Sequence, residues 1–139
     1  MGYVGLPLAL TFARSEFRVF GYDIDAEKIS KLRAGKSYIS SIPGEHIRDR
    51  TESGCFVPTS DADTIKTSDV IVICVPTPLS PEREPDLTYV QSTAEMLKPR
   101  LKLGHLVILE STTYPGCTVS IVKPQLQADG LTSGSDFYL

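Results

Sequence analysis

Short apolar runs alternate with helical patterns along this chain, and this alternation constrains its fold more than any other feature. Residues 18–22 (RVFGY), 70–75 (VIVICV) and 106–109 (LVIL) have the length and composition of strands, and the second run predicts a fully buried one. Helical patterns at residues 26–34 and 88–98 follow the first two runs. Such alternation is typical of βαβ units, so we predict an α/β fold with a Rossmann-like, doubly wound parallel sheet.

Capping and helix-breaking residues predict where several elements begin and end. Asp25 is suited to cap the start of the helix at 26–34, and Gly35 is suited to end it. Pro99 ends the helix at 88–98, and Pro124 is expected to kink a later one. The other elements that we predict are helices at residues 6–15, 45–53 and 118–127, a weaker strand at 55–58, a short connection at 61–67, a proline-rich loop at 76–85 and the start of a strand at 136–139.

Composition excludes several functional classes. A chain of 139 residues, 41% apolar and 22% charged, has the size and balance of one ordinary globular domain. The net charge of −3 is spread along the chain, which argues against a nucleic-acid surface or a polybasic membrane patch. The apolar runs are too short to span a bilayer, and we identify no signal peptide. We therefore expect a cytoplasmic protein that binds neither nucleic acid nor membrane.

The cysteines and histidines indicate structural roles rather than chemistry. Cys55, Cys74 and Cys117 share no metal-like spacing, so we predict no metal site. We interpret Cys74 as a small buried hydrophobic residue, because it lies inside an apolar run. Cys117 lies in a predicted loop, where a nucleophile is the weaker alternative because no histidine is near it in the sequence. His46 and His105 are isolated, and we interpret both as structural or surface residues.

The opening segment GYVG resembles part of a dinucleotide-binding fingerprint. Gly2 and Gly5 are three residues apart, as the second and third glycines of G-x-G-x-x-G must be. A pyrophosphate would then lie at the start of the helix that begins near Leu6, where free N–H groups and the helix dipole favour an anion. Taken alone this signal is weak, and a pair of glycines that merely allows close helix packing is the alternative.

An acidic residue at the expected distance strengthens the dinucleotide hypothesis. Asp23 ends the strand at 18–22 and follows Gly2 by 21 residues, near the position of a ribose-binding acid. A carboxylate there can accept hydrogen bonds from both ribose hydroxyls, each contributing about 1.5–3 kcal/mol. It would also repel a 2′-phosphate, so NAD is favoured over NADP. An N-cap role fits Asp25 better than Asp23, and Lys28 is either near the adenosine or simply solvated.

Two further loops at strand ends carry hydroxyl groups. VPTP (residues 75–78) and ESTTYPG (residues 110–116) follow the apolar strands. Thr77, Ser111, Thr112 and Thr113 offer hydroxyl and backbone groups suited to a ribose, a nicotinamide amide or a bound water. Loop threonines are usually turn formers, so these residues support a cofactor site only together with the first two features.

Taken together, GYVGLPLA, YDID, CVPTP with REPDL, and ESTTYPG resemble the N-terminal NAD-binding domain of the UDP-glucose/GDP-mannose dehydrogenase family. The matching segments cover essentially the whole chain in the family's order and spacing. The segments CVPTPLSPEREPDL and ESTTYPG most resemble those of the bacterial branch that oxidises UDP-N-acetylhexosamines. Enzymes of the UDP-N-acetylglucosamine 6-dehydrogenase type belong to that branch.

This resemblance implies an enzyme that uses NAD to oxidise a nucleotide sugar at C6, from alcohol to carboxylate, through a thiohemiacetal on a cysteine, for cell-surface polysaccharide biosynthesis. It implies a nucleotide-sugar substrate and a homodimer for the full-length enzyme. It also implies that Thr113 lies near the nicotinamide and the water used in hydrolysis, as a catalytic residue. The implied cofactor-binding residues are Gly2, Tyr3, Val4, Gly5, Asp23, Lys28, Val75, Thr77, Pro78, Thr112 and Thr113.

Departures from the family pattern suggest a partial domain. The family's first strand and first glycine, its catalytic cysteine and its sugar-binding domains have no counterpart here. We therefore expect residues 1–139 to be one NAD-binding domain, truncated at both ends and inactive alone. The missing strand is central in the order 3-2-1-4-5-6, so the strands at 18–22 and 70–75 would have open edges, and the isolated chain is expected to be marginally stable, to re-pair or to associate with another chain.

Two alternative functions remain open from the sequence. One is another Rossmann oxidoreductase of the hydroxyacid or 6-phosphogluconate type, which shares a G-x-x-G-x-P opening but is not expected to carry ESTTYPG. The other is a non-catalytic module that binds a dinucleotide or a partner chain.

Overall fold

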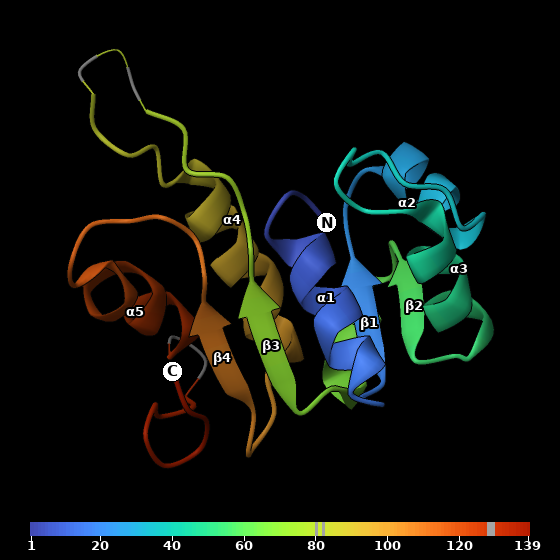
Figure 1. The fold of residues 1–139 in the computed structure, drawn as a ribbon. Coiled ribbons are helices and arrows are strands. Elements are labelled where there is room, and N and C mark those ends of the chain that lie inside the picture. The colour runs from blue at the N-terminus through green and yellow to red at the C-terminus, as the bar shows by residue number, and fades with distance from the viewer. Residues whose placement is uncertain (80, 82, 128–129) are drawn as a thin grey trace. The chain divides into compact units, whose positions relative to one another are not determined.

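Two parallel strand pairs form the framework of this structure (Figure 1). The computed structural model describes residues 1–79, 81, 83–127 and 130–139. The chain divides into two units, Met1–Ala62 and Asp63–Leu139, and each unit contains one of the strand pairs together with helices. The predicted α/β class and the parallel pairing are confirmed.

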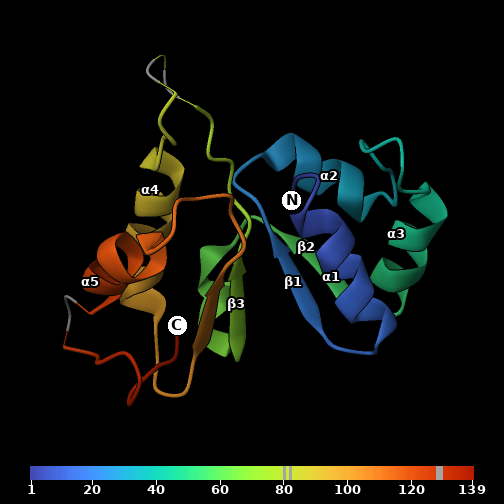
Figure 2. The ribbon, with the colours of Figure 1, turned by 60° about the vertical axis from the view of Figure 1, so that its left-hand side comes forward.

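The first unit contains three helices and one strand pair. Its elements in order are α1 (Gly5–Arg14), β1 (Val19–Tyr22), α2 (Ala26–Arg33), α3 (Gly44–Glu52) and β2 (Phe56–Thr59). Each lies within one or two residues of its predicted position. β1 and β2 lie side by side (Figure 2) and pair in register from Val19 opposite Phe56 to Tyr22 opposite Thr59.

The predicted ends of α2 are confirmed by the structure. The Asp25 carboxylate accepts hydrogen bonds from the N–H groups of Glu27 at 3.0 Å and Lys28 at 3.2 Å, so it caps two donors that have no partner inside the helix. Gly35 follows the helix with a φ of +66°, a left-handed conformation that glycine adopts without a steric penalty.

A close contact between Phe56 and Gly21 joins the strand pair to the core of this unit. The Phe56 side chain is fully buried, and a Cβ atom at Gly21 would lie 2.5 Å from its ring. Any larger residue at position 21 would therefore displace the ring. The same core contains apolar side chains from all three helices, namely Leu6, Ala9, Leu10, Ala13, Leu32 and Ile47, together with Ile39 from the segment between α2 and α3.

The second unit is built in the same way, with one unexpected helix. Its elements are β3 (Val70–Ile73), α4 (Thr88–Leu97), β4 (Leu106–Leu109) and α5 (Lys123–Leu126), with a 3₁₀ turn at Lys98–Arg100. A further 3₁₀ turn at Ala62–Thr67 begins at the last residue of the first unit. The segment predicted as one helix at 118–127 is instead a π-helical turn at Thr118–Val122 followed by α5. Pro124 explains the change, because it has no N–H to donate and its ring crowds the carbonyl one turn earlier.

The strand predicted at 70–75 is shorter and more exposed than expected, and the loop predicted at 76–85 is described only in part. β3 ends at Ile73 rather than at residue 75, and Val70 is 50% exposed rather than buried. In the loop at 76–85, residues 80 and 82 lie outside the described residues, and the others form no helix or strand beyond an isolated bridge between Leu79 and Pro85.

The two strand pairs have differently protected edges. On β2, Pro58 has no N–H to offer, and its carbonyl accepts a hydrogen bond from Arg33 Nε at 3.0 Å. Beside β4, Tyr138 forms an isolated parallel bridge to Leu106, so the segment predicted as the start of a strand at 136–139 pairs with β4 at one position but forms no strand. Among the described residues no strand pairs with the other edge of β1 or of β3, as the expected order without its central strand requires.

These open edges lead to a first prediction about association. We expect the 139-residue chain to self-associate as its concentration rises, because unpaired strand edges are templates for pairing. Val70→Lys places a charge on β3 and should shift the equilibrium towards monomer, as measured by light scattering after size-exclusion chromatography. Leu103→Lys is the control, since it adds the same charge at an exposed turn outside any strand. A monodisperse monomer with a cooperative melt at every concentration would contradict this prediction.

The cap of α2 leads to a second prediction. Asp25→Ala should lower the free energy of unfolding by about 1 kcal/mol, because two N–H groups lose their acceptor. Asp25→Asn keeps an acceptor oxygen and should cost only a few tenths of a kcal/mol, on the order of the difference between good caps. Urea unfolding followed by circular dichroism measures both values, and equal losses for the two variants would show that the cap has no such role.

Candidate functional site

The start of α1 and the end of β1 meet in the first unit. The amino group of Met1 donates a hydrogen bond to Oδ2 of Asp23, the residue that follows β1. Oδ1 of Asp23 accepts the N–H of Asp25 at 2.9 Å. Lys28 Nζ lies 3.9 Å from Oδ2 of Asp23. The predicted pyrophosphate loop, ribose acid and lysine therefore lie in one cluster.

Asp23 is held as a carboxylate with spare acceptor capacity. Burial opposes its ionisation, but hydrogen bonds from the amino terminus and from the Asp25 N–H outweigh burial and lower the pKa of Asp23 below its usual value. The stabilisation from these contacts is thus present above the ordinary pKa and is lost as the pH falls through the lowered one. Each carboxylate oxygen has two acceptor positions, so one position on each remains for another donor.

The first turn of α1 presents unused backbone donors. The Leu6 N–H donates to the Gly2 carbonyl at 3.1 Å. No hydrogen bond in the described part of the chain uses the N–H of four successive residues, Gly2, Tyr3, Val4 and Gly5. This turn contains no acidic side chain, and a Cβ atom at Gly2 would meet nothing within 4 Å. Free donors, the helix dipole and open space are the features that favour a bound anion at a helix start.

Tyr38 joins this cluster and was not expected from the sequence. Its hydroxyl donates a 2.5 Å hydrogen bond to the carbonyl of Met1. Burial, with a smaller contribution from the charges of Asp23 and Asp25, raises the pKa of Tyr38 to about 12, so the hydroxyl stays protonated as a donor. Tyr38 lies in an irregular segment between α2 and α3, and no local pattern marks it as a partner of the first residues.

Hydroxyl groups connect the two predicted loops of the second unit. Ser111 Oγ donates to the Val75 carbonyl at 2.7 Å and accepts the Val75 N–H at 3.0 Å. Thr77 Oγ1 donates to the Thr112 carbonyl. The loop after β3 and the loop after β4 are thus joined by side chains at the carboxyl ends of paired strands, where ligands bind in open α/β sheets.

The last two predicted residues are less constrained. Pro78 is exposed, and its carbonyl accepts the Asp86 N–H at 2.7 Å. Thr113 is half-buried and makes no hydrogen bond within the described part of the chain, so its hydroxyl is available to a ligand. The predicted residues therefore form two clusters, one in each unit.

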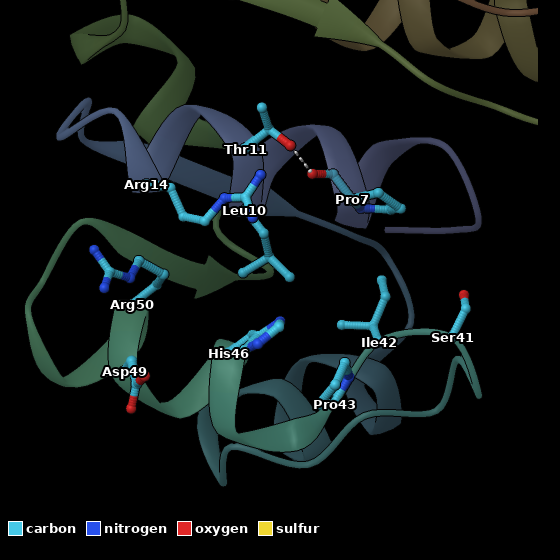
Figure 3. Close-up of a pocket in the computed structure, with 10 residues that line it drawn as sticks. All are labelled: Pro7, Leu10, Thr11, Arg14, Ser41, Ile42, Pro43, His46, Asp49 and Arg50. Atoms are coloured by element: carbon cyan, nitrogen blue, oxygen red, sulfur yellow. Dashed lines mark hydrogen bonds between the residues drawn. The ribbon is translucent and has the colours of Figure 1, made fainter.

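A cavity of about 250 Å³ lies elsewhere in the first unit, with α1 on one side and α3 and the segment that leads into it on the other (Figure 3). Leu10 and His46 face each other across it, and Arg14 and Arg50 lie at one end. None of the predicted cofactor-binding residues lines this cavity, and sequence reasoning did not identify it. His46 is exposed there, consistent with a surface residue.

The other candidate side chains have structural environments. Cys117 is 1% exposed, which excludes the alternative of an accessible nucleophile. Burial raises the pKa of the Cys74 thiol, which is half-buried rather than fully buried. His105 is buried, with Nε2 3.0 Å from the Ser68 carbonyl and Nδ1 accepting the Lys102 N–H, and burial lowers its pKa.

The described residues contain no group of three or more His, Cys, Asp or Glu side chains arranged to hold a metal ion. Within the same residues, no helix has the length and apolar character needed to cross a bilayer.

Comparison with known proteins places these features in a family. The model of the UDP-glucose/GDP-mannose dehydrogenase family, NAD binding domain, matches residues 1–139. The chain is 36% identical to the UDP-N-acetyl-D-mannosamine dehydrogenase of Pyrococcus horikoshii, over 100% of this chain and 33% of that enzyme. It is also 36% identical to the UDP-N-acetyl-D-glucosamine 6-dehydrogenase of Salmonella typhi, over 100% of this chain and 32% of the enzyme.

Solved structures agree with the sequence relatives. The structure of the Pyrococcus horikoshii UDP-D-ManNAc dehydrogenase matches with a TM-score of 0.90 at 36% identity, over 98% of this chain and 32% of that one. A ternary complex of GDP-mannose dehydrogenase from Pseudomonas aeruginosa matches with a TM-score of 0.90 at 27% identity, over 98% and 33% of the two chains. The chain spans about a third of the length of these relatives, and over that length it belongs to the UDP-glucose/GDP-mannose dehydrogenase family as its NAD-binding domain.

Proposed function

We propose that this chain is the cofactor-binding part of an NAD-dependent nucleotide-sugar 6-dehydrogenase that oxidises a UDP-N-acetylhexosamine from alcohol to carboxylate. The observation that carries the proposal is the cluster at the end of β1, where unused N–H donors lie beside an ionised Asp23. A phosphate group is suited to N–H donors at a helix start and a vicinal diol to a carboxylate acceptor, and adenosine diphosphate carries both groups.

The residues of the first unit fit the adenosine half of NAD. The N–H groups from Gly2 to Gly5 are the donors for pyrophosphate oxygens, and the positive end of α1 favours the charge. The remaining acceptor positions of Asp23 match the two ribose hydroxyls. Its negative charge disfavours a 2′-phosphate, which selects NAD over NADP. Lys28 lies beside Asp23 and faces the same region.

The residues of the second unit are assigned to the other half of the cofactor. Val75, Thr77, Pro78 and Thr112 would line the nicotinamide ribose, with Ser111 holding the two loops together. When bound, NAD⁺ supplies the hydride acceptor for the oxidation. Thr113, whose hydroxyl is without a protein partner in the described part of the chain, would orient the amide or a water beside it.

The sugar specificity is assigned outside this chain. The relatives named for UDP-N-acetyl-D-mannosamine and UDP-N-acetyl-D-glucosamine are about equally similar to it, so the substrate class rather than one sugar is proposed. We assign the catalytic cysteine, the sugar-binding residues and a homodimer contact to the two thirds of the relatives' length that this chain does not match. The proposal therefore treats residues 1–139 as one domain of a longer enzyme.

Binding and genetic context test this proposal directly. Isothermal titration of the 139-residue chain with NAD⁺ and NADP⁺ should show binding of NAD⁺ and a clear preference for it. Sequencing the coding DNA on both sides should show an in-frame strand ending in glycine upstream and a cysteine-bearing domain downstream. Extracts expressing that longer frame should reduce NAD⁺ when given UDP-N-acetylhexosamines. NAD⁺ binding without turnover by any longer frame would instead favour a non-catalytic dinucleotide module.

Asp23 provides the third prediction, on cofactor selectivity. Asp23→Asn should weaken NAD⁺ binding by about tenfold to a hundredfold, because charge-assisted hydrogen bonds to the ribose are lost. NADP⁺ should lose less, since the repulsion of its 2′-phosphate disappears, so the NAD⁺ preference should fall. Asp25→Asn is the matched control, because the same charge is removed two residues away at a helix cap. An unchanged NAD⁺ to NADP⁺ ratio in Asp23→Asn would exclude this role.

Ser111 provides the fourth prediction, on the second cluster. Ser111→Ala removes both hydrogen bonds to Val75 and should weaken NAD⁺ binding by about threefold to tenfold through loss of loop order. Binding of ADP, which lacks the nicotinamide half, should stay within about twofold of the unmodified chain if the loops serve only that half. Ser92→Ala, at an exposed position of α4, is the control. Equal losses for NAD⁺ and ADP would refute the assignment of these loops.

A further inference from the structure

A tyrosine outside the predicted site holds the backbone from which the pyrophosphate loop begins. Tyr38 Oη donates a 2.5 Å hydrogen bond to the carbonyl of Met1, although 36 residues separate the two positions. Met1 also contacts Asp23, so both ends of the Met1 residue are held by side chains of the cluster.

Tyr38 itself is rigidly placed. Its ring packs against the core of the first unit and is half-buried. The backbone on either side is locked, because Ser37 Oγ donates to the Ile39 carbonyl at 2.9 Å and accepts the Ile39 N–H at 3.1 Å. Ile39 is 3% exposed and anchors the turn in the core. A side chain with a fixed ring and a fixed backbone can impose the position of its hydrogen-bond partner.

The position of the Met1 carbonyl determines the direction of the next N–H group. The chain contains no cis peptide bond in its described part, and in a trans peptide the C=O of one residue and the N–H of the next point in opposite directions. With the Met1 carbonyl turned towards Tyr38, the Gly2 N–H is turned away from it. That N–H has no partner among the described residues, and the space around Gly2 is open.

We propose that Tyr38 is a positioning residue for the cofactor: by holding the Met1 carbonyl, its hydroxyl aims the Gly2 N–H at an oxygen of the diphosphate. This inference rests on the proposed function, and it adds a residue from the segment between α2 and α3 to the NAD site. Tyr38 acts through the peptide rather than by touching the ligand. Its contribution is therefore confined to ligands that carry a diphosphate.

Two probes separate this role from a general structural one. ADP carries both the diphosphate and the adenosine ribose, whereas adenosine carries only the ribose that faces Asp23. Tyr38→Phe, which keeps the ring and removes the hydroxyl, should weaken ADP binding to the 139-residue chain by about fivefold to tenfold. Adenosine binding, followed by NMR titration, should stay within about twofold of the unmodified chain, because its ribose contact is unaffected. Tyr89→Phe, on the exposed face of α4, is the matched control and should change neither.

The possible outcomes distinguish the positioning role of Tyr38 from the proposed function. Unchanged ADP binding in Tyr38→Phe, or an equal loss for ADP and adenosine, overturns the positioning role while leaving the proposed function intact. Failure of the unmodified chain to bind either NAD⁺ or ADP overturns the proposed function, and this inference with it.

A second variant covers the case in which Tyr38→Phe does not fold. Ser37→Ala keeps the phenol but loosens its turn, and should weaken ADP binding by about twofold to threefold with adenosine unaffected. In the unmodified chain the Gly2 amide resonance should shift on addition of ADP and remain in place on addition of adenosine. An unshifted Gly2 resonance with ADP bound would also overturn the proposal.

Discussion

The parallel pairing of β1 with β2 is the constraint on which the first unit depends. α1 leads through a short connection into β1, which runs back beside it, so the residue after β1 lies next to the residues that precede α1 (Figure 1). The pairing is possible at this depth because Gly21 leaves room for the Phe56 ring. A fully buried ring in that position joins the strands to α1, α2 and α3 in one core. The geometry of the proposed ligand site therefore depends on apolar packing several residues away.

Charges and dipoles determine which groups the cluster at Asp23 and the start of α1 can bind. The first turn of α1 offers N–H groups and no acidic side chain, while the adjacent Asp23 is kept ionised by donors from two directions. The Met1 amino group and Lys28 are the cations nearest to Asp23, whereas the start of α1 contributes only the dipoles of its N–H groups. This arrangement is the basis on which we propose a ligand that carries a diphosphate beside a diol.

The second unit repeats the arrangement with hydroxyl groups in place of charges. β3 and β4 are also parallel, and Ser111 connects the backbone after one strand to the backbone after the other. Its two hydrogen bonds satisfy both polar groups of Val75, which would otherwise face an irregular loop. The chain spans about a third of its relatives, so these two clusters represent the cofactor side of the proposed chemistry and the sugar side is assigned elsewhere.

The sequence by itself determined the elements and the family. Alternating apolar runs, the Asp25 cap and Gly35 are local signals, and local signals are readable because neighbouring residues decide them. The spacing of Gly2, Gly5 and Asp23 was readable for the same reason, since one βα unit fixes it. The π-helical turn was predicted only in part. Pro124 indicated that the helix would be distorted, but not that the distortion would be a π-helical turn.

Only the tertiary structure decided how distant segments meet. Tyr38 reaches Met1 because the segment after α2 returns along the core, and no pattern within a few residues encodes that return. The exposure of Val70, the bond from Ser111 to Val75 and the cavity beside His46 likewise depend on which elements become neighbours. Local chemistry specifies what each element can bind, whereas long-range packing specifies which of those elements act together.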